Sequence, residues 1–119
     1  MIARDIVNIV DAKPLLISDM GHMDKDYEHA FASDLMSDVL ALIQNNQDTT
    51  VLVTGLCNSQ VLRTAEMMDI EMVLFVRGKE LDASHLMLAQ DLNINLFSTK
   101  YTMYEACGLL YKNGMGAIQ

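Results

Sequence analysis

The residues that could bind a ligand follow short apolar runs in the second half of the chain. Three such runs each end at a polar or glycine stop and then pass into helical spacing: Val51–Val53, Met72–Val76 and Leu96–Phe97. The pattern recurs about every 22 residues, a spacing typical of consecutive strand–helix units, and it predicts a parallel sheet. Ligands of open parallel sheets bind beyond the carboxyl ends of the strands. The stops are therefore the first candidate binding residues.

The candidate ligand contacts are polar and glycine residues at these stops and at the start of an earlier helix. They are Ser33, Asp34, Asp38, Thr54, Asn58, Arg77, Gly78, Ser98 and Thr99. Hydroxyl and amide groups among them would exchange hydrogen bonds with a ligand, and Arg77 would meet an anion. Gly78 would allow close approach of the backbone. A surface salt bridge is the simpler alternative for Arg77 and its neighbour Lys79.

The segment Thr54–Gln60 lies between a predicted strand and a predicted helix. Backbone amides and the helix dipole attract anions at such a junction. The segment lacks the Gly-Lys-Ser/Thr ending of a P-loop and the glycine spacing of a dinucleotide fingerprint. A turn followed by a helix cap at Asn58 is the simpler interpretation.

Two features leave an enzyme open as an alternative. Cys57 precedes a predicted helix N-terminus, a setting that lowers the pKa of a thiol, but a nucleophile also needs a nearby base. Asp34 and Asp38 are four residues apart and would share one side of a helix. Paired carboxylates can perform acid–base chemistry, although carboxylates in a first turn also stabilise the helix through its dipole.

The charged segment Ser18–Tyr27 is the least regular part of the chain. It carries His22, Asp24 and Asp26, with His29 close behind. The spacing lacks the continuation of a calcium loop, and zinc sites show tighter pairing of His and Cys. We therefore expect a solvated loop, and no metal or cofactor.

Composition narrows the class of protein. The 119 residues fit a single domain, and 51% hydrophobic against 20% charged residues is enough for a packed core. A net charge of −8 disfavours nucleic acid and anionic membrane surfaces as partners. No apolar run is long enough to span a membrane, no secretion signal begins the chain, and two cysteines form no disulfide framework. We expect a cytoplasmic protein.

Periodicity and capping signals predict the remaining elements. The predicted strands are 15–17, 28–32, 50–54, 72–76 and 96–97. The predicted helices are 2–10, one from about 35 to 44, and three that begin after caps at Asn58, Asp82 and Thr102. Ser33 and Asp34 offer cap oxygens to the second helix, and Gly114 is placed to end the last one.

Two segments resemble the DRTGG domain family. They are Asp34–Leu40, and Phe97–Ala106 followed by Gly108–Tyr111. The order of elements between them agrees as well, so the resemblance runs from about residue 33 to 114. Where the family commonly carries Thr-Gly-Gly at the third strand end, this chain has Val76-Arg77-Gly78. Only Gly78 of that turn remains.

The resemblance implies a three-layer α/β fold over residues 1–119, with a mainly parallel sheet flanked by helices, similar to the N-terminal domain of HPr kinase/phosphorylase. It implies a non-catalytic, dimer-forming regulatory module, because such domains accompany CBS domains in regulated pyrophosphatases. A nucleotide or other small anionic metabolite is the ligand it suggests. Without a P-loop, HPr kinase activity is not expected. The alternatives are an enzyme that uses Asp34, Asp38 or Cys57 on a small metabolite, and a module that binds only a partner protein.

Overall fold

The three apolar runs form the centre of the fold. In the computed structural model, which describes residues 1–118, they become β3 (Thr50–Thr54), β4 (Met72–Phe75) and β5 (Asn95–Ser98). The three strands lie side by side and run parallel. All of their residues are buried, because helices cover both faces of the sheet. The predicted parallel arrangement is confirmed.

Three further strands extend the sheet to the order β1-β5-β4-β3-β2-β6. β2 (His29–Ala32) runs parallel to β3, and β6 (Gly116–Ala117) runs parallel to β2. β1 (Lys13–Leu16) is antiparallel to β5 on the opposite edge. It begins two residues before the predicted strand and contains Pro14, which an edge strand tolerates because one side of it forms no ladder hydrogen bonds.

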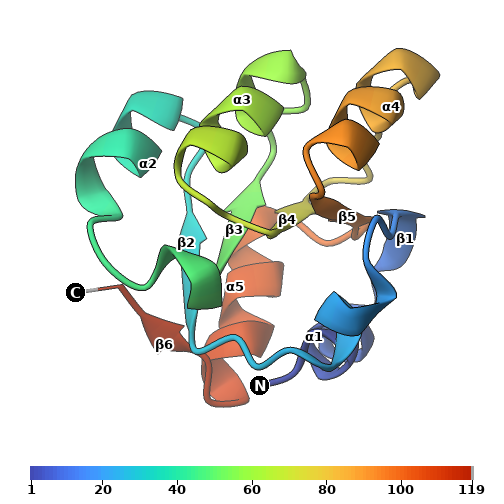
Figure 1. The fold of residues 1–119 in the computed structure, drawn as a ribbon. Helices are drawn as coiled ribbons and strands as arrows, with labels where there is room; N and C mark the ends of the chain where they lie inside the picture. Colours follow the sequence, from blue (N-terminus) through green and yellow to red (C-terminus); the bar gives the residue numbers. More distant parts are fainter. Residues whose placement is uncertain (119) are drawn as a thin grey trace.

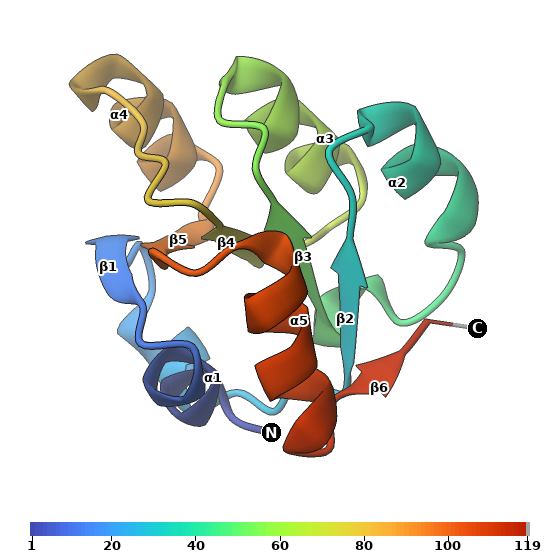
Figure 2. The ribbon, with the colours of Figure 1, turned by 180° about the vertical axis from the view of Figure 1, so that it is seen from behind.

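Helices cover the two faces unequally (Figures 1 and 2). The five α-helices are α1 (Ala3–Ile9), α2 (Met36–Leu42), α3 (Ser59–Met67), α4 (Ala83–Asp91) and α5 (Met103–Lys112). α2, α3 and α4 cover one face, while α1 and α5 cover the other. Val51 and Val53 point into the core beneath α1 and α5, and Leu52 points into the core beneath α2, α3 and α4, as the alternation of a strand requires. The three-layer α/β fold is confirmed.

Most predicted caps form, and one does not. Asn58, Asp82 and Thr102 each accept a hydrogen bond from a backbone amide in the first turn of α3, α4 and α5. Leu35 occupies the N-cap position of α2, which has no side-chain cap. The predicted capping by Ser33 and Asp34 is therefore wrong: Ser33 accepts only from the amide of Leu35 itself, and the Asp34 carboxylate turns away from α2 towards the end of β3.

The segment Ser18–Tyr27 is more ordered than its sequence indicates. It contains the 3-10 helix η1 (Met20–Asp24). Asn95 fastens it to the sheet, since the Asn95 carboxamide oxygen accepts from the Ser18 amide at 2.8 Å and from the Asp19 amide at 3.2 Å. A second 3-10 helix, η2 (Gln47–Thr49), precedes β3. Within residues 1–118, no helix has the length and apolar character needed to cross a membrane.

Candidate functional site

Four parallel strands end at one edge of the sheet, and the segments that leave it meet there. Asp34, just after β2, points to the end of the neighbouring strand β3. Its Oδ1 atom accepts hydrogen bonds from the Gly55 amide at 2.6 Å and from the Thr54 hydroxyl at 3.3 Å. The Thr54 oxygen accepts in turn from the Leu56 amide at 3.1 Å. These contacts join the exits of β2 and β3.

Arg77 follows β4 in an unusual backbone conformation. Its φ angle is 60°, and every other non-glycine residue with positive φ in the described chain is Asn or Asp. A left-handed conformation costs a side-chain-bearing residue about 1–2 kcal/mol. The turn is held against the segment after β5, because the Arg77 amide donates to Tyr101 O and the Gly78 amide donates to Thr99 O, both at 2.8 Å. Gly78, with φ of 68°, adopts the same region without strain.

The Arg77 side chain reaches back across the neighbouring strand exit. Its Nη2 atom donates to the Gly55 carbonyl at 3.4 Å. A Cβ atom added at Gly55 would lie 2.5 Å from Arg77 Nη2 and 3.2 Å from Asp34 Oδ1. Gly55 therefore permits a cationic and an anionic side chain to approach one peptide unit. Arg77 forms no ion pair with any residue of 1–118.

The remaining polar residues at this edge are already hydrogen-bonded to the protein. Ser98 donates to Lys79 O at 2.7 Å, Thr99 donates to Val10 O at 2.6 Å, and both side chains are buried. Asn58 caps α3. These residues hold the turns in place, and whether they also contact a ligand stays a prediction.

The two candidate carboxylates do not share a helix face. Asp34 precedes α2, while Asp38 lies exposed in its first turn. Ser33, partly exposed, accepts a hydrogen bond from the Leu35 amide at 3.0 Å. The predicted placement of an acid–base pair on one side of α2 is therefore wrong.

Cys57 lacks the environment expected of a reactive thiol. Burial raises the pKa of Cys57 above its ordinary value, and the positive charge of Lys79 opposes this only in part. The predicted lowering of the thiol pKa is therefore wrong, because desolvation by burial is the largest influence on this group. Burial also raises the pKa of Cys107. No group of three or more metal-ligating side chains occurs in the part of the chain that the structure describes.

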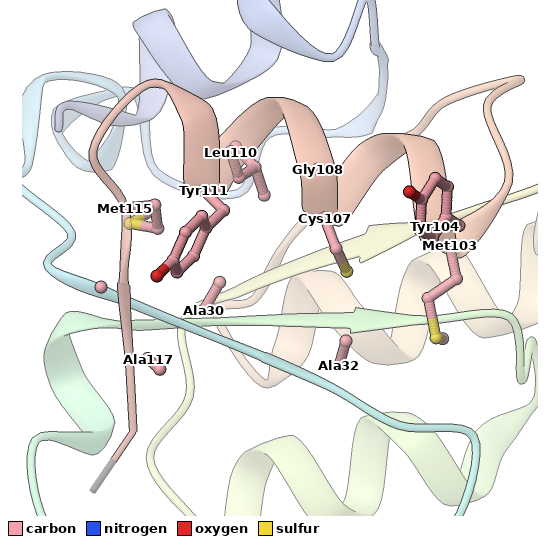
Figure 3. Close-up of a pocket in the computed structure, with 11 residues that line it drawn as sticks. Ala30, Ala32, Met103, Tyr104, Cys107, Gly108, Leu110, Tyr111, Met115 and Ala117 are labelled. Atoms are coloured by element: carbon pink, nitrogen blue, oxygen red, sulfur yellow. The ribbon is translucent and has the colours of Figure 1, made fainter.

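Gly55 and a second surface were missed by sequence reasoning. The second surface is an open apolar groove of about 640 Å³ between α5 and the edge formed by β2 and β6 (Figure 3). We call it the α5 groove. Ala30 and Ala32 of β2 line one side, and Cys107 and Tyr111 of α5 line the other. Tyr111 is 77% exposed. A glycine directly after a buried strand was the available signal for Gly55.

Among known proteins, a similarity is found to solved structures. No family model and no curated protein matches the sequence. Among solved structures, the fold is similar to the CBS and DRTGG domains of the regulatory region of Clostridium perfringens pyrophosphatase, complexed with the activator diadenosine tetraphosphate. The TM-score is 0.69 at 13% identity, and the match covers 92% of this chain and 45% of that one. This chain therefore corresponds to less than half of that regulatory region, and the resemblance to DRTGG domains is confirmed at the level of the fold.

Proposed function

We propose that this chain is a cytoplasmic, non-catalytic regulatory module that binds a small anionic ligand, a nucleotide in the first instance, at the carboxyl edge of its sheet. The observation that carries the proposal is Arg77, held at positive φ with its guanidinium over Gly55. Strained backbone of this kind clusters at functional sites. The free thiols Cys57 and Cys107 suit a reducing compartment.

Local charge supports an anion at this edge. The protein as a whole has a net charge of −8, so an anion approaches only where positive charge is concentrated. Arg77 and Lys79 are both exposed on the turn after β4. The planar guanidinium of Arg77 can donate two parallel hydrogen bonds to a phosphate group, and Gly78 adds no side chain that would block its approach.

The similarity in fold to a nucleotide-bound regulatory region supports a nucleotide as the ligand. The regulatory region that is similar in fold was solved with diadenosine tetraphosphate, named there as an activator. Such a ligand combines several negative charges with planar bases. The charges would meet Arg77, and exposed polar residues on the α2 side of the edge, Ser33 and Asp38, would face the ribose or the base.

Thermal-shift measurements with ATP, AMP, diadenosine tetraphosphate and inorganic pyrophosphate test this proposal. A bound ligand at a hundredfold excess over its Kd stabilises the folded state by about 2.7 kcal/mol. Stabilisation should disappear in Arg77→Ala and persist in Arg63→Ala, a matched control because Arg63 is exposed on α3. Equal stabilisation of the two variants would contradict the proposal. Turnover of the ligand that is lost in Asp38→Asn or Cys57→Ser would establish the enzyme alternative instead.

We also propose that the module forms a homodimer through the α5 groove. The groove is lined by apolar and small side chains and by Tyr104 and Tyr111, which are 88% and 77% exposed. Apolar surface with exposed tyrosines is typical of protein interfaces. A different partner protein at the same groove is the alternative, and it predicts a monomer in the purified state.

A further inference from the structure

We propose that the Asp34 carboxylate is a built-in anion that occupies the end of β3 in the free protein, and that the ligand binds by displacing it. The inference rests on the proposed function and adds a regulatory contact and a ligand class to it. The class is an anion with two or more negative charges, such as a diphosphate. A singly charged ligand has no advantage over the carboxylate that is already in place.

The contacts of Asp34 are those of a bound anion. One oxygen, Oδ1, accepts from a backbone amide at 2.6 Å and from the Thr54 hydroxyl at 3.3 Å. The Arg77 guanidinium packs against the same Gly55 peptide. Backbone amides, a hydroxyl and a guanidinium are the groups that proteins use to bind phosphate oxygens. Here one amide and one hydroxyl donate to an oxygen of the protein itself, and the guanidinium, which forms no ion pair with Asp34, lies against the same Gly55 peptide.

Asp34 is positioned so that its carboxylate can move away from the Gly55 amide. It is exposed, and it belongs neither to β2, which ends at Ala32, nor to α2, which begins at Met36. Its side chain can rotate into solvent without breaking a strand or a helix. Gly55, in contrast, is buried, and a buried amide requires an acceptor. The departure of Asp34 therefore requires that another oxygen take its place.

Because the Asp34 carboxylate is covalently attached to the chain near its hydrogen-bond donors, it competes well with free anions for them. A carboxylate fixed near its donors acts at a high effective concentration, and while it stays it repels a second anion. The affinity of the wild-type protein is therefore lower than the same donors would give without this charge. A ligand with several charges recovers the difference by engaging Arg77 and the Gly55 amide together.

Isothermal titration with inorganic pyrophosphate tests the inference by comparing Asp34→Asn with Glu66→Gln. Each substitution removes one negative charge from an exposed carboxylate, but Asp34 contacts the Gly55 amide, whereas Glu66 lies on α3 outside the proposed site. Asparagine keeps a carbonyl oxygen for that amide, so the fold is retained. We expect pyrophosphate to bind about tenfold more tightly to Asp34→Asn and less than about twofold more tightly to Glu66→Gln. Equal or weaker binding by Asp34→Asn would overturn the inference.

A second measurement separates this inference from the proposed function. In the wild-type protein, pyrophosphate should shift the amide proton resonance of Gly55 as the carboxylate is replaced. If pyrophosphate binds in an Arg77-dependent way and Asp34→Asn binds no more tightly, the function stands and the displacement is wrong. If no variant binds pyrophosphate, both are wrong. Should Asp34→Asn fail to fold, Asp34→Ser supplies an uncharged acceptor for the same comparison.

Discussion

The carboxyl edge and the α5 groove are built by opposite means. At the edge, side chains from separate segments are fixed by hydrogen bonds, such as those from the Gly55 amide to Asp34 and from the Arg77 amide to Tyr101. The groove comes from one helix and an edge of the sheet, and its lining is apolar. Fixed charges select a small ligand, whereas apolar area suits a broad partner. A substitution at the carboxyl edge should therefore leave self-association unchanged, and a substitution in the α5 groove should leave anion binding unchanged.

The largest change in anion affinity should result from substitution of Arg77. Charge-assisted hydrogen bonds are each worth about 1.5–3 kcal/mol, so Arg77→Ala should weaken anion binding by about tenfold to a hundredfold in calorimetry. Arg77→Gly should weaken it equally but relieve the positive φ, and should unfold with a free energy about 1 kcal/mol higher than Arg77→Ala. Self-association should be unchanged in both. Retained binding in either variant would contradict the role of Arg77.

The next effect should come from the groove. Tyr111→Glu places a charge on the proposed interface and should weaken dimerisation by about 2 kcal/mol or more, which sedimentation equilibrium measures. Met87→Glu is the matched control, because Met87 is 70% exposed on α4, away from the groove. Pyrophosphate binding should be unchanged in both. A wild-type protein that remains monomeric at high concentration would rule out the homodimer.

Alanine substitutions at Gly55 and Gly108 should affect different properties of the protein. Gly55→Ala would push its new methyl group against the Arg77 guanidinium, so anion affinity should fall several-fold. Gly108→Ala lies in α5 with no heavy atom within 4 Å of the added Cβ. It should raise the free energy of unfolding by about 0.5–1 kcal/mol, because alanine favours helix. Denaturant unfolding and calorimetry check both, and equal affinity of the two variants would argue against a site at Gly55.

The smallest effect concerns Cys57. Its thiolate is the reactive form, and burial raises its pKa. Alkylation should therefore be slow near neutral pH and should still be accelerating as the pH passes the ordinary thiol pKa. A rate that is already at its plateau at pH 7 would show a lowered pKa and would restore the enzyme alternative.

The sequence predicted the fold better than the contacts. Buried strands such as β3 carry a strong apolar signal, and the topological rule places their exits at one edge. The contact of Asp34 with Gly55 depends on the pairing of β2 with β3, which no local pattern reveals. The local pattern around Asp34 therefore predicts only a helix cap. The two-residue strand β6 is too short for periodicity, so the groove beside it was not predicted.

Backbone amide shifts during titration with ATP report directly on the proposed anion site. We expect saturable shifts that cluster at Gly55, Arg77 and Gly78, and that vanish in Arg77→Ala. Shifts that cluster instead along α5 and β6, or the absence of saturable shifts with ATP and with pyrophosphate, would contradict an anion site at the carboxyl edge.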